Sequence, residues 1–277
     1  MTAVIVSNKL RVSLFGVLLL TCSPVGYAQR VPADAILMPD AKIENAQAAR
    51  LGNHLYLSLA SLGADGQPQA GQVSIPRLAS SLTDMRWLEQ KADSTLSLKV
   101  EQDHWIVQWK SRPSNATVIV LSFDAAPQLM SEVKPARAAG DGAIYLKASD
   151  ANTNGEKIRY EPQTFKNTVG YWVGKQDYAE WKLAVAQPGK YNVGILQGCG
   201  AGQGGSQAKL TLANDGKSSE LPFEVLETGH FQNFQWRHVG QLDVDSAGPY
   251  SLKLEPIEIK KNALMDVRAI HLVPLPK

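Results

Sequence analysis

The stretch Tyr178-Ala179-Glu180-Trp181-Lys182-Leu183-Ala184-Val185, followed by Pro188-Gly189-Lys190-Tyr191, decides the fold of this chain. Apolar and polar side chains alternate through its first eight residues, as in a half-buried β-strand, and the Pro-Gly pair then marks a turn. Comparable short apolar segments recur about every ten to fifteen residues from residue 143 onward, which is the spacing of strands in a sandwich. The second half therefore predicts an antiparallel β-sandwich.

The first half shows the same alternation in His54-Leu55-Tyr56-Leu57-Ser58-Leu59 and in Trp105-Ile106-Val107-Gln108-Trp109. Residues 118–123 form a nearly continuous apolar run, which is typical of a central strand. Only residues 41–50 favour a helix, and that helix would be short. We expect an all-β protein with two antiparallel β-sandwich domains, residues 29–130 and 143–277. The Pro-, Ala- and Gly-rich residues 131–142 between them predict a linker.

The N-terminus has the pattern of a secretory signal peptide. Lys9 and Arg11 precede the apolar residues 12–20, a run too short to span a bilayer, and Gly26-Tyr27-Ala28 offers a cleavage site after Ala28. The alternative is a lipoprotein processed at Cys22, for which the preceding threonine is a poor fit. The sequence predicts a periplasmic or secreted protein with residues 1–28 removed.

Charge and cysteine content narrow the range of partners. The formal net charge is +2 and the basic residues are scattered, which disfavours nucleic acid or an anionic membrane as a partner. Beyond the signal no apolar run approaches the roughly 20 residues of a membrane span. Cleavage after Ala28 leaves Cys199 as the only cysteine, so no intrachain disulfide is expected.

No motif in the sequence predicts catalysis. Gly200-Ala201-Gly202-Gln203-Gly204-Gly205 matches a dinucleotide-binding pattern, but residues 207–212 alternate as a strand where that site needs a helix. Cys199 has no basic neighbour in sequence, and the histidines lack metal-binding spacing. The paired carboxylates that hydrolyse glycosides come together only in the folded chain, so the sequence alone does not exclude such a pair. We expect a binding protein and not an enzyme.

Several of these segments also resemble a known group of proteins. Val169-Gly170-Tyr171, Asp177-Tyr178-Ala179-Glu180-Trp181, Thr228-Gly229-His230-Phe231 and Met265-Asp266-Val267 resemble carbohydrate-binding modules of families 6 and 35. The resemblance covers about residues 143–274 and implies a galactose-binding-like jelly roll. The stretch from Gln197 to Phe234 is similar to the C-terminal β-sandwich of bacterial α-L-fucosidases and sulfatases. Gly52-Asn53-His54-Leu55-Tyr56-Leu57 resembles the smaller sandwich that follows the catalytic barrel of those fucosidases.

A non-catalytic accessory protein is what this resemblance implies. A (β/α)₈ barrel needs about 250 residues and an alternating strand–helix pattern, which this chain lacks. The implied ligand is a polysaccharide or glycan, fucosylated or sulfated. The alternative is a structural or protein-interaction module that packs against a glycoside hydrolase or sulfatase. Aromatic rings beside amides would favour sugar, and a flat apolar patch rimmed by charge would favour a protein.

The resemblance also implies the binding residues. It places Tyr171 and Phe231 as the two aromatic side chains of a sugar cleft at the loop end of the sandwich, with Asn262 as its amide. His230, Asn233 and Trp236 belong to the same predicted loop as Phe231, and Trp172 is expected either there or in the core. The competing interpretation makes Tyr171 and Phe231 rim or core residues.

No cofactor is expected, although related modules hold a structural Ca²⁺. Asp266 is the candidate ligand here, and pairing with Arg268 is its alternative role. Ca²⁺ takes six or more oxygen ligands, and the first strand of this domain lacks the acidic pair that the resemblance requires.

Overall fold

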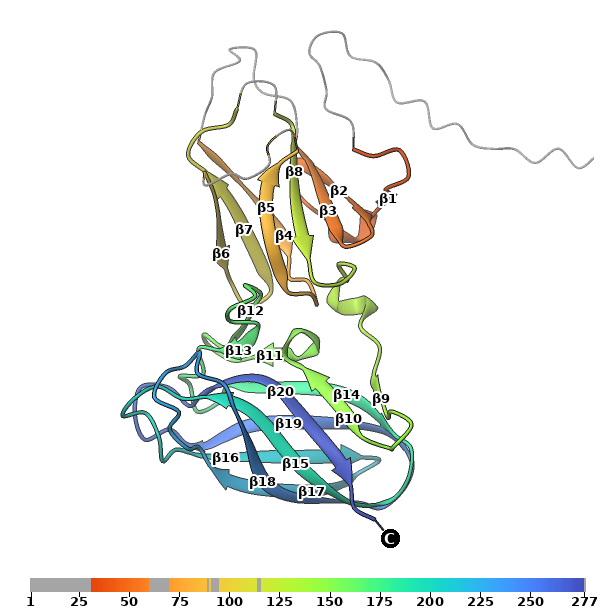
Figure 1. Cartoon of the computed structure of the whole chain (residues 1–277), viewed down its shortest axis with the longest axis vertical. Helices are drawn as coiled ribbons and strands as arrows, with labels where there is room; N and C mark the ends of the chain where they lie inside the picture. Colours follow the sequence, from red (N-terminus) through yellow and green to blue (C-terminus); the bar gives the residue numbers. More distant parts are fainter. Residues whose placement is uncertain (1–30, 60–69, 89, 91–94, 114–115, 277) are drawn as a thin grey trace, which may run out of the picture.

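The computed structural model describes residues 31–59, 70–88, 90, 95–113 and 116–276. The signal peptide and Cys22 lie outside these residues. The described residues form an all-β protein of two antiparallel sandwiches, which confirms the predicted fold class. The two sandwiches lie one above the other along the long axis of the molecule (Figure 1).

The first sandwich packs a five-stranded sheet against a three-stranded sheet. The five-stranded sheet has the order β1 (Ile36–Leu37), β2 (Ala46–Leu51), β3 (His54–Leu59), β8 (Val118–Phe123), β5 (Leu82–Trp87). The three-stranded sheet has the order β4 (Gly71–Pro76), β7 (His104–Trp109), β6 (Leu96–Val100). Leu57, Trp87, Trp105 and Ile119 are fully buried between them, as the alternation along these strands predicts.

The expected helix over residues 41–50 does not form. A single 3-10 turn, η1 (Pro39–Ala41), precedes β2, which pairs on one side with β1 and on the other with β3. The prediction was wrong because it followed the intrinsic helix preference of the alanines. Ala48 and Ala49 are buried by the sheet, so tertiary pairing overrides that preference.

The second sandwich stacks two six-stranded sheets. The first, here called the β20 sheet, has the order β12 (Arg159–Glu161), β13 (Thr168–Gly170), β20 (Asp266–Pro274), β15 (Gly189–Gly198), β18 (Gln235–Val244), with β10 (Ile144–Lys147) also paired to β20. The second, here called the β14 sheet, has the order β11 (Asn152–Asn154), β14 (Tyr178–Val185), β19 (Gly248–Glu258), β16 (Gln207–Asn214), β17 (Lys217–Glu224), with β9 (Ala136–Arg137) also paired to β14. From β13 onward the chain crosses between the sheets at every connection except the β16–β17 hairpin, which is the path of a jelly roll.

The predicted linker contains regular structure. It begins within η2 (Met130–Glu132) and includes β9, which adds a parallel strand to β14. A short turn, η3 (Ala148–Asp150), follows β10 and lies near β13 and β20. The segment that joins the sandwiches is therefore part of the second one.

The two sandwiches share one continuous apolar core. The ring of Trp105 lies 6.4 Å from that of Tyr160, measured between centroids. The Leu82 N–H donates to Pro162 O at 2.7 Å, and Arg77 Nη2 donates to Ser149 O at 2.9 Å. These contacts fix the β12–β13 region against the first sandwich.

Candidate functional site

Three aromatic rings contact one another on the outer face of the β20 sheet. Tyr145 on β10 and His271 on β20 are directly opposite each other, with ring centroids 5.8 Å apart. Trp236 on β18 lies 6.2 Å from His271 and 6.3 Å from Tyr145. Tyr145 is 47% exposed and Trp236 is 49% exposed. We call these three side chains the ring row.

The strand between β20 and β18 leaves room for the ring row. Gly194 on β15 is opposite His271, and a Cβ atom added there would lie 3.4 Å from the Trp236 ring. Asn192 and Gln241 lie next along the same face, and the Gln241 amide donates to Asn192 Oδ1 at 3.1 Å. The face therefore combines exposed ring surfaces with amide donors and acceptors, which are the groups that contact the C–H faces and hydroxyls of a sugar.

The other predicted binding residues lie in loops at one end of the second sandwich. The Leu264 N–H donates to Trp172 O at 2.9 Å, and the Asn262 N–H donates to Gln203 Oε1 at 3.0 Å. The Cys199 N–H donates to Thr228 Oγ1 at 2.8 Å. The loops that carry Tyr171, Asn262 and Phe231 thus lie at one end of the sandwich.

Tyr171 presents an exposed ring at this end. It is 43% exposed and adopts φ 59°, a left-handed conformation that costs a non-glycine residue about 1–2 kcal/mol. The Arg159 guanidinium lies 3.4 Å from the centroid of its ring, and Lys166 Nζ lies 6.0 Å from it. One face of Tyr171 is therefore covered by a cation.

Other predicted ligand contacts have structural roles. Trp172 is fully buried, so its placement in the cleft was wrong and its core alternative holds. The half-buried Phe231 ring packs against Gly200. His230 Nδ1 accepts from the Gln232 N–H at 3.0 Å, and Asn233 Nδ2 donates to Thr228 O at 2.5 Å. These contacts stabilise the loop from within.

Two further predicted residues are placed differently from the expectation. Trp236 lies on β18 and not in the loop with Phe231, because β18 begins at Gln235. Asn262 is exposed beside Gln203, and its backbone N–H makes that contact. The predicted single cleft is thus two regions, the ring row on the sheet face and Tyr171 at the loop end.

Asp266 does not have the surroundings of a calcium ligand. It is buried, and burial raises the pKa of its carboxyl to about 8, helped by the nearby Glu161, while Lys166 and Arg268 act in the opposite direction. Lys166 pairs with Glu161 at 2.8 Å. Among the described residues, no group of three or more His, Cys, Asp or Glu side chains gathers to hold a metal ion. The donor set therefore does not fit Ca²⁺.

Cys199 has the properties of a structural residue. Its side chain is buried, and burial raises the pKa of the thiol to about 11, with smaller contributions from Glu227 and Asp266. A thiol with so high a pKa holds its proton at neutral pH and is a poor nucleophile.

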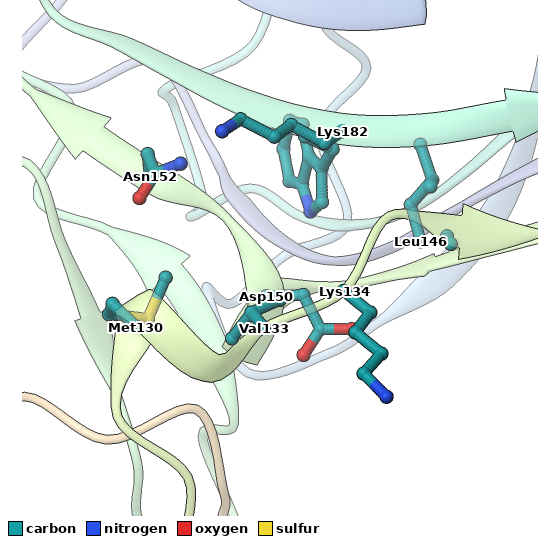
Figure 2. A pocket seen from close by; sticks show the side chains of 9 residues that line it. Met130, Val133, Lys134, Leu146, Asp150, Asn152 and Lys182 are labelled. Atoms are coloured by element: carbon teal, nitrogen blue, oxygen red, sulfur yellow. The ribbon is translucent and has the colours of Figure 1, made fainter. Parts of the chain in front are cut away.

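Two hollows near the junction of the sandwiches are lined by both polar and apolar residues. A groove of about 840 Å³ is lined by η2, β11 and the β6–β7 turn, including Arg77, Gln102, Asp103 and Asn152. A smaller cavity of about 40 Å³ adjoins it, where Met130 and Val133 lie below Asn152 and Lys182 (Figure 2). The groove is lined by no aromatic ring among the described residues, and the ring that lines the smaller cavity, Trp181, is buried.

Sequence reasoning missed Tyr145 and His271. Each occupies an outward position in an alternating strand, Ile144-Tyr145-Leu146 and Ile270-His271-Leu272. The alternation predicts that both side chains face solvent, but their pairing depends on the register of β10 and β20. That register is a property of the folded sheet.

Comparisons with known proteins found similarity to solved structures at low sequence identity. No protein-family model and no curated protein sequence matches the chain. An α-L-fucosidase structure from Vibrio sp. strain EJY3 is similar over 82% of this chain at 12% identity and a TM-score of 0.34, and the match spans 39% of its length. The family 35 module of Abf62 from Cellvibrio japonicus is similar over 48% of this chain and 94% of its own, at 14% identity and a TM-score of 0.37. The C-terminal family 6 module of the laminarinase LamC from Zobellia galactanivorans is similar over 47% of this chain and 98% of its own, at 21% identity and a TM-score of 0.38.

The part of the chain that the structure describes has no helix long and apolar enough to cross a membrane.

Proposed function

We propose that this chain is an exported, non-catalytic protein that binds a polysaccharide or glycan. The observation that carries this proposal is the ring row of Tyr145, His271 and Trp236, two of whose rings are about half exposed beside the amides of Asn192 and Gln241. A pyranose presents apolar C–H groups on its faces and hydroxyls at its rim. Exposed rings cover the former, and amides pair with the latter.

The protein acts by holding its ligand without changing it. The rings are presented by paired strands of one sheet, so the surface is largely formed before the ligand arrives. A shallow surface of this size supports weak binding, roughly micromolar to millimolar. Such affinity suits a module that keeps a polymer near a partner enzyme or the cell surface.

The class of polysaccharide to test first is suggested by the resemblance to the C-terminal sandwiches of fucosidases and sulfatases. Fucosylated or sulfated polysaccharides are the first ligands to test. A periplasmic or secreted location is part of the proposal, since the signal peptide predicted over residues 1–28 would export the chain.

Binding of the mature protein to a glycan panel tests this function, with Trp236→Ala and Tyr145→Ala beside the unmodified protein. Tyr178→Ala is the matched control, because Tyr178 is a partly exposed tyrosine on β14 of the opposite sheet. We expect binding to one class of glycan, a loss of about tenfold or more in each ring-row variant, and no loss in the control.

The opposite result has a defined meaning. A folded protein that binds no glycan in the panel contradicts the proposal. Loss of binding to a hydrolase or sulfatase in the same two variants would identify the ring row as a protein interface instead, which is the alternative that the sequence left open.

A further inference from the structure

A positive group without a carboxylate partner lies at the Tyr171 end of the β20 sheet. Among the described residues, the Arg159 side chain forms no ion pair and no hydrogen bond, and its Nε atom is buried without a partner. Its guanidinium is held instead against the ring of Tyr171, 3.4 Å from the centroid. The side chain as a whole is partly exposed, so the Nη groups are the donors left for a ligand.

Among the described residues, the acids near this end of the sheet are paired with lysines or protonated. Glu161 is buried and paired with Lys166 at 2.8 Å. Glu101 of the first sandwich pairs with Lys99 at 2.7 Å, which lowers the pKa of its carboxyl, and the charge of Arg159 adds to that shift without forming an ion pair. Burial raises the pKa of Asp266 to about 8, so this carboxyl is mostly protonated at neutral pH.

A second cation is fixed in the same region. The Arg268 guanidinium lies 3.8 Å from the centroid of the Phe234 ring and donates to the carbonyls of Phe165 and Lys166. These bonds hold the turn after β12, which carries Lys166 and presents Phe165 to solvent at 63% exposure. The end of the sheet therefore has positive groups stacked on rings.

This cationic end belongs to the same face as the ring row. Leu196 is opposite Trp236, and Gly198, two residues further along β15, is opposite Asp266. The Asp266 side chain lies against Gly170, and Gly170 is opposite Arg159. Residues opposite each other in antiparallel strands share a face. From β18, which carries Trp236, to β12, which carries Arg159, is four strand spacings, roughly 19 Å, so one extended ligand of several sugar units can reach both ends.

We infer that the saccharide bound on this face carries an anionic group, a sulfate ester or a carboxylate, and that Arg159 stacked on Tyr171 binds it. The inference rests on the proposed function and deepens it by naming the class of ligand. The planar guanidinium presents paired N–H donors that match the two oxygens of either anion. The stack on Tyr171 fixes its orientation before the ligand arrives.

The experiment compares one polymer backbone with and without its charge. A sulfated fucan is paired with the same fucan after desulfation, and polygalacturonate is paired with its methyl ester. The two pairs distinguish sulfate from carboxylate. We expect the protein to bind one charged polymer more tightly than its uncharged form, and high salt to weaken that preference.

Variants of Arg159 locate the subsite. Arg159→Gln is expected to lower affinity for the charged polymer by about tenfold or more, the loss typical of a hydrogen bond to a charged group, and to leave the uncharged form unaffected. Arg159→Lys keeps the charge without the paired donors and should give an intermediate loss. Arg137→Gln, an exposed arginine on β9 of the other sheet, is the matched control. Thermal denaturation confirms that each variant is folded.

Each contrary outcome overturns a stated part of the argument. Equal affinity for the charged and uncharged polymers overturns the inference and leaves the proposed function standing. An equal loss for both polymers in Arg159→Gln overturns the assignment of Arg159 as the anion-binding residue. No binding of either polymer in both pairs removes the proposed function and the inference together.

Discussion

Trp105 of the first sandwich packs against Tyr160 of the second, with ring centroids 6.4 Å apart and an angle of 37° between the rings. Trp105 also stacks on Phe123 in its own sandwich at 6.5 Å, and the Arg77 guanidinium lies 5.0 Å from the Tyr160 ring centroid. The apolar core thus continues from one sandwich into the other. We therefore expect the two sandwiches to unfold as one cooperative unit.

Trp105→Ala is expected to separate the two sandwiches. Truncation of a buried tryptophan costs about 3–5 kcal/mol and here removes the ring that joins the cores. Differential scanning calorimetry should show one transition for the unmodified protein and two for the variant. Trp87→Ala removes an equally buried ring within the first sandwich alone, and it should lower the melting temperature while keeping one transition. Two transitions in the unmodified protein would contradict this account.

Asp177→Ala is expected to release the segment that carries Tyr171. The buried Asp177 carboxylate accepts the backbone N–H groups of Glu156, Val173 and Gly174 at 2.8–3.0 Å. Without these bonds the unfolding free energy should fall by about 3 kcal/mol, because buried donors lose their acceptor. Hydrogen exchange at the same three amides measures the effect directly.

Gly155→Ala provides a second test of the same contact. Gly155 has φ 147°, and a Cβ atom there would overlap Asp177 Oδ1. The variant should displace the Asp177 carboxylate without removing it, and so raise exchange at the Val173 and Gly174 amides. Unchanged exchange in both variants would show that Asp177 does not hold the segment.

Gly194→Val is expected to displace the Trp236 ring of the ring row, because Gly194 lies on the strand beneath that ring. The added Cβ lies at contact distance from Trp236, 3.4 Å, so the two methyl groups beyond it displace the ring. The strand should tolerate valine, with a stability change of about 0.5 kcal/mol or less, since β-branched residues favour strands. Glycan affinity should fall severalfold, whereas Gly216→Ala, in an open turn of the other sheet, should not change affinity. Unaltered affinity in Gly194→Val would argue against Trp236 as a binding surface.

The fold was predictable because alternation is a local property. Residues 178–185 and 54–59 both form the strands that their patterns predict. Ala46 to Ala49 misled the prediction, because helix preference is also local and β2 is held by partners on both sides. Patterns within a segment mispredict its structure where pairing with other strands determines it.

The candidate site was predictable only in part for the same reason. Trp236 and Tyr171 were identified as ring residues, and both are exposed. Tyr145 and His271 needed the pairing of β10 with β20, strands separated by more than 100 residues of chain. Trp172 is buried directly after Tyr171, whose left-handed backbone conformation the alternation of the sequence did not predict.

Asp266→Asn is expected to stabilise the protein at neutral and alkaline pH. The folded-state pKa of Asp266 is raised from 3.8 to about 8, chiefly by burial, so folding favours the protonated form. Its contribution to stability is complete below about pH 4 and is lost progressively as pH rises toward 8, since the unfolded carboxyl ionises first. The loss is at most about 1.4 kcal/mol per pH unit in that window. Asparagine cannot ionise. The free energy of unfolding of the variant, measured by urea denaturation, should therefore rise relative to that of the unmodified protein from pH 5 to pH 8.

Asp245→Asn, which removes an exposed carboxylate paired with Lys217, is the control and should leave the pH dependence nearly unchanged. If Asp266→Asn and the unmodified protein show parallel profiles over that range, Asp266 is ionised in the folded protein, and the positive charge of Lys166 and Arg268 outweighs its burial. In that case the carboxylate would also offset Arg159 at the end of the sheet throughout this pH range, and the preference for an anionic saccharide should be weaker at every pH tested.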